Sequence, residues 1–285
     1  MPYLLESKKE EIKILIEQGF TYIEIANVYN THKETVARLV RYYKYSHINL
    51  EYFDVIDTET KAYLLGFILA DGSLYKVTGY NSLILDIGVN SRDREVVELI
   101  RDEISPSHKI YDKVIEDKNF KKKESCLKSV ITIGCTKLCK KLIEKYKFSL
   151  DKSHDINYEF PFDTIPKELH RHFIRGFFDG DGHIGMNNCK YFQKRKNILI
   201  QYHRISRIGF TSCHIKFLNQ LIIHLPKVNN PRIYTRDMYT NNLHFTINQK
   251  NHREFYDFFY KDSTKFLSRK HNSFLLGLDN TEVTI

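Results

Sequence analysis

The chain of 285 residues has room for two domains, or for one domain with an appendage. Its composition, with 42% apolar and 28% charged residues, 6 Pro and 12 Gly, excludes a disordered, collagen-like or coiled-coil protein. Lys and Arg (44) outnumber Asp and Glu (35), and the resulting net charge of +9 favours a polyanionic partner such as nucleic acid.

Cysteine usage and hydropathy indicate where the chain resides. It has 5 cysteines, and this odd number favours a reducing compartment over a secreted disulfide scaffold. The opening MPYLLESKKE lacks the pattern of a signal peptide, and the longest apolar run, AYLLGFILA, ends at Asp71, short of a membrane span. We therefore expect a cytoplasmic protein without a membrane partner.

Residues 1–45 are predicted to form three short helices. They are KKEEIKILIEQ, which Gly19 ends, followed by YIEIANVY and KETVARLVRYYKY. This is the order of a helix-turn-helix module, whose last helix would present Lys33, Thr35, Arg38 and Arg41 to a DNA major groove. A three-helix appendage with a solvated basic face is the alternative. Residues 46–57 are expected to be a linker.

From residue 58 onward the chain contains a weak internal repeat. LLGFILADG (64–72) and IRGFFDGDG (174–182) share the pattern G-F-x-x-x-D-G, and the flanking segments 129–146 and 243–260 are also similar. Each half, 58–165 and 166–285, is predicted to follow the order αββαββα. The basic stretch KYFQKRKNILIQYHR lengthens the first hairpin of the second half. Antiparallel strand pairs separated by helices predict an α+β fold.

The repeated helices carry small residues and then an acid. The small residues lie four apart, which allows two helices to pack closely, and they are Gly66 with Ala70 and Gly176 with Gly180. We expect the next glycine to end each helix with positive φ, leaving Asp71 and Asp181 at the negative end of the helix dipole. A hard divalent cation would relieve that repulsion. Side by side, the two acids would form a site for metal-assisted phosphodiester hydrolysis.

The two nine-residue stretches resemble the LAGLIDADG motif of homing endonucleases, in the single-chain type with two motifs. The resemblance covers about residues 58–280. It implies that the motif helices form the interface between pseudo-symmetric halves, and that the two sheets form a saddle over the DNA major groove. It also implies that Asp71 and Asp181 bind Mg²⁺ or another divalent cation such as Mn²⁺, with Gly72 and Gly182 at the same metal centre.

The match departs from the family pattern at two places. Where the family name spells its earlier Asp, this chain has Leu69 in the first copy and Asp179 in the second. Arg175 stands at a position that is often small or apolar, and we expect it at the edge of the interface.

The resemblance also places a basic residue after the last helix of each half. FSLDKSHDI points to Lys152, and KFLSRKHNSF points to Lys270. A lysine there would stabilise charge on the phosphate or orient the attacking water. Surface lysines on a basic protein are the alternative. If the register differs, the substitutes are Lys128, Lys265 and Arg269.

Basic side chains in the predicted strand hairpins are expected to contact phosphates, with a solvated surface as the alternative. These residues are Lys121, Lys122, Lys123, Lys194, Arg195, Lys196, Arg204, Arg207, Arg232 and Arg236.

Two further patterns have plain interpretations. Cys135 and Cys139 lie four apart, but a structural zinc site needs four ligands and no second close pair is evident, which favours ordinary thiols. The tripeptide 271–273 (His-Asn-Ser) resembles an intein splice junction, but no splicing-domain start is present, which favours a free-standing protein.

Together these features predict a monomeric, Mg²⁺-dependent, site-specific double-strand DNA endonuclease of a mobile genetic element, without a small-molecule substrate. Asp71, Asp181, Lys152 and Lys270 are its expected catalytic residues. It would act in the cytoplasm, or in the host of a phage or mobile intron, with a nucleus or organelle also open. An intron RNA maturase of the same fold and a DNA-binding regulator without cleavage are the alternatives. Retention of both acids weighs against the regulator but not against the maturase.

Overall fold

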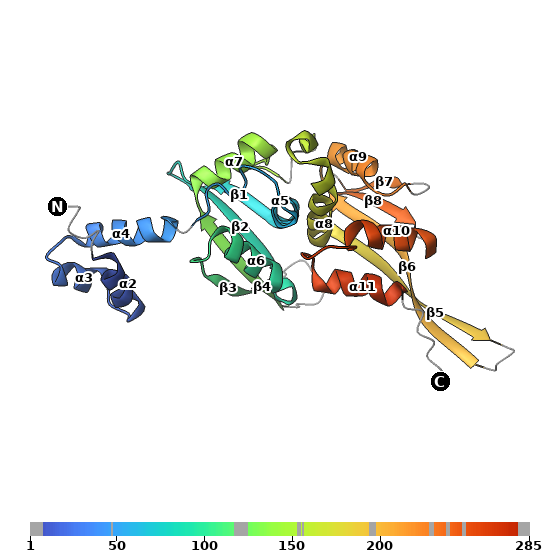
Figure 1. The fold of residues 1–285 in the computed structure, drawn as a ribbon, viewed down its shortest axis with the longest axis horizontal. Helices are drawn as coiled ribbons and strands as arrows, with labels where there is room; N and C mark the ends of the chain where they lie inside the picture. The colour runs from blue at the N-terminus through green and yellow to red at the C-terminus, as the bar shows by residue number, and fades with distance from the viewer. Residues whose placement is uncertain are drawn as a thin grey trace.

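The computed structural model describes residues 8–46, 48–116, 125–152, 155, 157–193, 198–227, 231–237, 240–246 and 249–278. Figure 1 shows a small helical unit at one end of the molecule, followed by two larger halves, each with its own sheet. The motif helices α5 and α8 lie between the two sheets.

The N-terminal unit consists of three helices with a core of their own. They are α2 (Lys9–Glu17), α3 (Tyr22–Val28) and α4 (Lys33–Ser46). Their buried contacts are made by Ile12, Ile25, Ala26 and Val36. Gly19, with φ of 92°, follows α2 as expected, and Asn30, with φ of 44°, turns the chain between α3 and α4. All three predicted helices are therefore present.

The segment that was expected to be a linker packs instead against the first half. Tyr52, Phe53 and Ile56 are buried in the main core. The hydroxyl of Tyr146 donates to the carbonyl of Phe53 at 2.8 Å, and the Lys141 ammonium donates to the Leu50 carbonyl at 2.7 Å. Residues 48–56 of the expected linker therefore belong to the main core, where their apolar side chains are buried.

The two halves have the same topology. The first contains α5 (Glu59–Asp71), β1 (Gly72–Lys76), β2 (Leu83–Asn90), α6 (Arg94–Ile104), β3 (Ile110–Glu116), β4 (Ser125–Gly134) and α7 (Thr136–Tyr146). The second contains α8 (His170–Asp181), β5 (Gly182–Gln193), β6 (Ile198–Ser212), α9 (Ile215–His224), β7 (Arg232–Asp237), β8 (Thr240–Thr246) and α10 (Gln249–Phe259). The strand orders, β1-β2-β4-β3 and β5-β6-β8-β7, are equivalent, and all pairs are antiparallel. The predicted αββαββα order and α+β class are confirmed.

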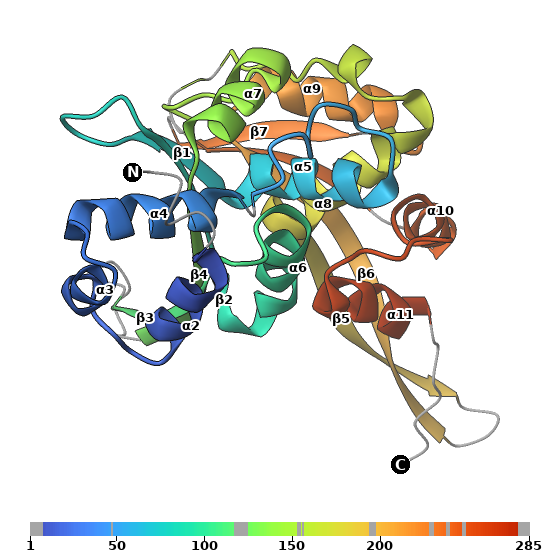
Figure 2. The ribbon, with the colours of Figure 1, turned by 60° about the vertical axis from the view of Figure 1, so that its left-hand side comes forward.

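Two features distinguish the second half. Its first hairpin is longer, with 12 and 15 residues in β5 and β6 against 5 and 8 in β1 and β2. Figures 1 and 2 show this hairpin projecting beyond the rest of the fold. The second half also has an additional helix, α11 (Ser268–Leu278), which the sequence did not predict.

Each sheet buries one face under helices and leaves the other face open. In β2, alternate residues from Leu83 to Val89 are buried. In β6, Ile208 and Phe210 are fully buried, whereas Arg207, the residue before Ile208, is exposed. This period of two is that of a sheet covered on one side. In the described part of the chain, no helix is long and apolar enough to cross a membrane.

Candidate active site

The site is built where the two motif helices cross with their backbones in contact. A Cβ atom on Gly66 would lie 1.9 Å from the carbonyl oxygen of Phe173, and one on Gly176 would lie 1.9 Å from that of Tyr63. Side chains of any size are therefore excluded at both positions. The small residues therefore allow the two helices, one from each half, to pack with their backbones in contact.

This close crossing brings the two acids to the same place. A Cβ on Gly180 would lie 2.3 Å from the Ala70 Cβ and 3.0 Å from Oδ2 of Asp71. The Asp71 carboxylate therefore lies against the residue that precedes Asp181. Both aspartates are the last residues of their helices, and both are partly exposed.

The glycine after each acid serves a purpose that the sequence did not predict. Gly72 has φ of −76° and Gly182 has φ of −84°, both with extended ψ, so the expectation of positive φ was wrong. A Cβ on Gly72 would lie 2.4 Å from the Ile68 carbonyl oxygen, and one on Gly182 would lie 2.2 Å from the Phe178 ring. Glycine is needed because the strand starts directly under the last helical turn, where no Cβ fits.

The electrostatics at the crossing are those of two acids held in a partly buried site. Burial raises the pKa of Asp181 to about 7; the Lys152 ammonium opposes this rise and the Asp71 carboxylate adds to it. Burial also raises the pKa of Asp71, against the charges of Lys152 and Lys270. Each carboxylate anion is thus destabilised, and a bound cation would stabilise both.

The two predicted lysines occupy equivalent places at the ends of the motif helices. The Lys152 ammonium donates to the carbonyl oxygens of Ala70 and, at 3.5 Å, of Gly72. The Lys270 ammonium donates to the carbonyl oxygens of Phe178 at 2.5 Å and Gly182 at 2.6 Å. Each lysine therefore donates to carbonyl oxygens at one helix C-terminus and brings a positive charge beside an aspartate.

Burial lowers the pKa of both lysines, and the nearby acids oppose that effect. The pKa of Lys270 falls to about 8, while that of Lys152 is lowered against the charges of Asp181 and Asp71. Both side chains therefore belong to one charged cluster that spans the junction.

The donor set at this cluster fits a hard divalent cation. Mg²⁺ is usually held by one or two carboxylates, with waters and substrate phosphates as its remaining ligands. Asp71 and Asp181 supply two carboxylates. The carbonyls of Gly72 and Gly182, which are also expected at the metal centre, accept hydrogen bonds from Lys152 and Lys270 and each keep a second lone pair. The carboxylates are the anionic groups that attract the cation.

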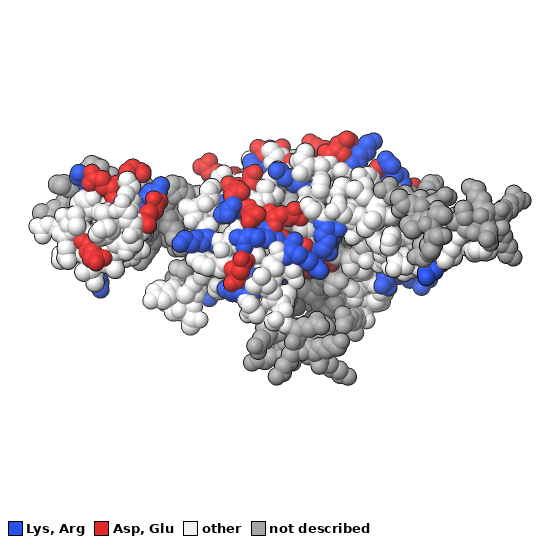
Figure 3. All heavy atoms as spheres, turned by 90° about the horizontal axis from the view of Figure 1, so that it is seen from below, with Lys and Arg blue, Asp and Glu red and all other residues white. Residues whose placement is uncertain are grey.

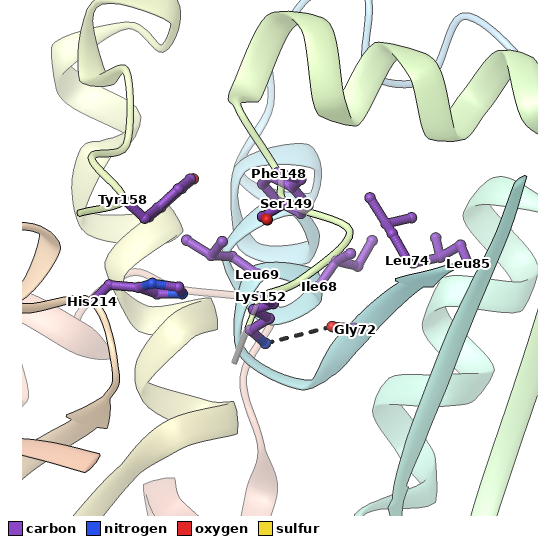
Figure 4. Close-up of a pocket in the computed structure, with 10 residues that line it drawn as sticks. All are labelled: Ile68, Leu69, Gly72, Leu74, Leu85, Phe148, Ser149, Lys152, Tyr158 and His214. Atoms are coloured by element: carbon purple, nitrogen blue, oxygen red, sulfur yellow. Dashed lines mark hydrogen bonds between the residues drawn. The ribbon is translucent and has the colours of Figure 1, made fainter. Parts of the chain in front are cut away.

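Lys152 lines a small pocket, whose lining side chains Figure 4 shows. Its walls are mainly apolar and come from both halves, with Lys152, Tyr158 and His214 as the charged or titratable side chains. The lining residues are Ile68, Leu69, Gly72, Leu74, Leu85, Phe148, Ser149, Lys152, Tyr158 and His214. The apolar walls explain why the Lys152 ammonium turns toward the helix carbonyls.

Arg175 lies inside the interface and not at its edge. The side chain is fully buried, so the expectation from the sequence was wrong. It forms an ion pair with Glu59 of the other half at 2.7 Å, and it donates to the carbonyls of Lys265 at 2.8 Å and Phe259 at 2.9 Å. An arginine is tolerated among small and apolar residues because each of its three guanidinium nitrogens donates to a partner.

Glu59 joins the two halves through this ion pair. Burial tends to raise its pKa, but the backbone N–H groups of Lys265 and Thr264 and the charge of Arg175 outweigh that effect and keep the pKa below its ordinary value of 4.5. We expect Glu59→Gln to lower the free energy of unfolding at pH 7 by about 3 kcal/mol, because the buried Arg175 charge loses its partner.

The pH dependence tests the origin of this effect. A carboxylate whose pKa is lowered on folding stabilises the fold above its unfolded pKa, and this stabilisation is lost as the pH falls through the folded value. The difference between wild type and Glu59→Gln, measured by urea unfolding, should therefore shrink below pH 4.5. Asp57→Asn, which removes an ion pair of an exposed carboxylate with Lys61, is the control and should change stability by less than about 1 kcal/mol. A difference that stays constant with pH would contradict the ion-pair explanation.

Asp179, the departure from the family pattern in the second motif, is a buried structural acid. Its carboxylate accepts hydrogen bonds from the hydroxyl of Tyr63 at 3.0 Å and the backbone N–H of Leu267 at 2.7 Å. Burial raises its pKa to about 6, against the charge of Lys270 and these hydrogen bonds. It therefore fixes the segment that leads into α11 and does not face the partly exposed pair of aspartates.

Further ion pairs across the halves hold the start of α11. Arg269 makes two hydrogen bonds to Asp93, of 3.0 and 2.9 Å, and Ser268 donates to Glu95 through its backbone N–H and its hydroxyl, both at 2.7 Å. Acidic and basic side chains are interspersed in the middle of the face shown in Figure 3. These contacts position α11, and with it Lys270. From the sequence, Arg269 is expected only as a substitute for Lys270, and no signal points to Asp93 or Glu95.

The predicted DNA contacts are distributed over the described surface. Lys33 and Arg38 on α4 are exposed and Thr35 is half-buried. Arg204, Arg207 and Arg232 are exposed in β6 and β7. Lys121, Lys122, Lys123, Lys194, Arg195 and Lys196, and the side chains of Arg41 and Arg236, lie outside what the structure describes. Of the other two substitutes for the predicted lysines, Lys128 lies close enough to Asp71 to lower its pKa, and Lys265 accepts a hydrogen bond from Arg175 through its carbonyl.

The cysteines are free thiols in the structure. Cys139 is buried and Cys135 is half-buried, and burial raises the pKa of Cys139 to about 12. Among the residues that the structure describes, no three His, Cys, Asp or Glu side chains group into a metal site.

Comparisons with known proteins find similar folds among solved structures. No family model matches the sequence, and no curated protein matches it. Solved structures with a similar fold include the LAGLIDADG meganuclease I-CpaMI bound to uncleaved DNA, with 15% identity, a TM-score of 0.49, and coverage of 76% of this chain and 90% of that one. I-SmaMI bound to an uncleaved DNA target with calcium ions has 15% identity and a TM-score of 0.48, over 75% and 87% of the two chains. The LAGLIDADG homing endonuclease I-LtrWI bound to target DNA has 15% identity and a TM-score of 0.46, over 81% and 91%. The chain is thus similar in fold to these LAGLIDADG homing endonucleases.

Proposed function

We propose that the chain is a site-specific DNA endonuclease that hydrolyses phosphodiesters with divalent metal ions held between Asp71 and Asp181. The observation that carries this proposal is the position of the Asp71 carboxylate, 3.0 Å from where a Gly180 Cβ would lie, beside Asp181. Two carboxylates from separate halves meet at one place only because glycine is present at the crossing. The two sequence motifs give the same assignment independently.

In this proposal the aspartates and the lysines have different roles. Mg²⁺ or Mn²⁺, when bound, would polarise the scissile phosphates and lower the pKa of an attacking water. Asp71 and Asp181 would hold the cations, and the backbone contact between α5 and α8 fixes their separation. Lys152 and Lys270 place positive charge beside the acids, where it would stabilise the negative charge that develops on the phosphate.

The open sheet faces are the proposed DNA surface. Arg204, Arg207 and Arg232 are exposed in the second sheet, and arginine is the residue best suited to phosphate and guanine contacts. The duplicated halves favour a roughly pseudo-palindromic target, each half binding one side. One chain supplies both halves, which supports a monomer.

The test is cleavage of a randomised duplex library by the full chain. With Mg²⁺ we expect discrete double-strand products from a subset of sequences, and with EDTA we expect binding without products. Enrichment of bound duplexes without any cleavage in Mg²⁺ or Mn²⁺ would overturn the nuclease proposal and favour the DNA-binding regulator. Selective binding of a structured intron RNA over duplex DNA would favour the maturase.

The N-terminal unit is proposed to add DNA contacts beyond one end of the target. Lys33 and Arg38 are exposed on α4, the last of its three helices. We expect Lys33→Ala and Arg38→Ala each to weaken binding to the selected duplex and to reduce the slope of log affinity against log salt by about 1. The cleavage rate of the bound duplex should not change. Lys13→Ala, an exposed lysine on α2, is the matched control. Slopes that equal that of the wild type in both α4 variants would contradict a DNA-binding role of this face.

A further inference from the structure

A second group of side chains with metal-ligand chemistry lies at the opposite end of α8. His170 is the first residue of α8 and His224 is the last residue of α9. Their Nδ1 atoms are 3.4 Å apart, and their rings lie nearly perpendicular at 84°. With a rise of 1.5 Å per residue, His170 is about 16 Å from Asp181 along the helix. The pair is therefore separate from the candidate active site.

The protonation of His170 is fixed by its surroundings. Its Nε2 atom lies 3.0 Å from the carbonyl oxygens of both Phe162 and Ile165. Carbonyl oxygens only accept hydrogen bonds, so Nε2 carries the proton and donates it. In the neutral ring, Nδ1 then presents its lone pair toward His224. Metal-binding histidines are commonly oriented in this way, by a backbone carbonyl at the second ring nitrogen.

The spacing of the two nitrogens suits a shared ion. Zinc–nitrogen bonds of 2.0–2.1 Å in tetrahedral geometry place two ligand nitrogens about 3.3 to 3.4 Å apart. The observed separation of the Nδ1 atoms is 3.4 Å. A direct N–H···N hydrogen bond is usually shorter, because the donor–acceptor distance of protein hydrogen bonds is about 2.7–3.2 Å.

Packing holds both rings in place before any ion binds. The Phe162 ring lies 4.1 Å from the His224 ring and 5.1 Å from the His170 ring, measured between centroids. Both histidines are half-buried. Burial lowers the pKa of His224, and the charges of His170 and Lys167 lower it further. Little side-chain entropy remains to be lost on binding.

We propose that His170 and His224 form a two-histidine site for a divalent transition-metal ion such as Zn²⁺. Imidazole nitrogen suits Zn²⁺, Ni²⁺ and Cu²⁺, whereas Mg²⁺ prefers oxygen, so this site differs in chemistry from the aspartate pair. No third His, Cys, Asp or Glu groups with the pair in the described part of the chain, so water completes the coordination. The proton on Nδ1 of His224 moves to its Nε2 through solvent, and no net proton is released. The ion links the first turn of α8 to the last turn of α9.

The test is a titration of the full chain, free of any affinity tag, with ZnCl₂ by calorimetry. We expect the chain to bind one Zn²⁺ ion. His170→Gln and His224→Gln should each weaken this binding at least tenfold, because each removes one ligand. The melting temperature should rise with Zn²⁺ in the wild type and not in these variants. Lys167→Gln keeps both ligands but removes a positive charge near His224. It should tighten Zn²⁺ binding, because that charge repels the cation.

The matched control is a second pair of histidines. The rings of His183 and His244 lie 4.6 Å apart, measured between centroids, in the second sheet. His183→Gln and His244→Gln should leave the affinity for Zn²⁺ unchanged. Binding that survives His224→Gln, or that is lost in His183→Gln instead, would overturn the proposal. If His224→Gln fails to fold, an unchanged Zn²⁺ affinity of Lys167→Gln would overturn it as well.

Discussion

Asp181→Asn is expected to abolish double-strand cleavage while leaving DNA binding intact. The substitution keeps the size of the side chain but removes one of the two carboxylates that meet where α5 and α8 cross. Loss of a charged metal ligand should slow hydrolysis at least about 10³-fold, which corresponds to about 4 kcal/mol of transition-state stabilisation. The measurement is single-turnover cleavage of the duplex selected from the library, with gel-shift affinity measured in parallel. Asp71→Asn should have an effect of the same size.

The variant also separates catalysis from folding. Burial raises the pKa of Asp181, so the anion is destabilised in the folded chain without a cation. Replacing it with a neutral amide should therefore not lower the melting temperature without metal. Asp102→Asn, an exposed acid paired with Arg101, is the control and should leave cleavage unchanged. Wild-type cleavage rates in Asp181→Asn would rule out the proposed metal ligand.

Gly176→Ala is expected to have the largest effect on the fold. The added methyl group would lie 1.9 Å from the Tyr63 carbonyl oxygen and 2.9 Å from the backbone nitrogen of Phe67. Backbone atoms cannot turn aside as a flexible side chain can, so α5 and α8 must separate. We expect a loss of about 3 kcal/mol or more in the free energy of unfolding, measured by urea unfolding. Gly66→Ala should behave in the same way, because its Cβ would meet the Phe173 carbonyl oxygen.

The control for this prediction is Gly88→Ala. A Cβ at Gly88 would meet only the Val130 side chain, at 3.3 Å. Its effect on stability should be within about 1 kcal/mol. Similar stabilities of Gly176→Ala and Gly88→Ala would show that the helices do not cross in backbone contact. A folded Gly176→Ala protein that has lost cleavage would instead indicate that the helices separate enough to move the aspartates apart.

The elements of each half were predictable because their signals are local. Strands of period two and helices of period 3.6 follow from the spacing of apolar residues, and both sheets formed where that spacing placed them. The short segment 48–56 was misassigned as a linker because it lacks periodicity, although Tyr52 and Phe53 are buried in the core. Helix α11 was not predicted because its first residues are held by distant side chains. Asp93 and Glu95, which bind Arg269 and Ser268, lie 176 and 173 positions earlier in the chain.

The sequence by itself determined the duplication, the small residues of the motif helices and the two acids at their ends. These features depend only on the spacing of residues along the chain, and each of them occurs in both copies of the repeat. The tertiary structure alone decided that Arg175 is buried, that Lys152 and Lys270 cap helix carbonyls, and that Gly72 and Gly182 serve close packing with negative φ. Each of these depends on which atoms occupy the space next to a residue. The neighbouring atoms belong to segments distant in sequence or to the folded backbone itself. The spacing of residues along the chain therefore does not predict these contacts.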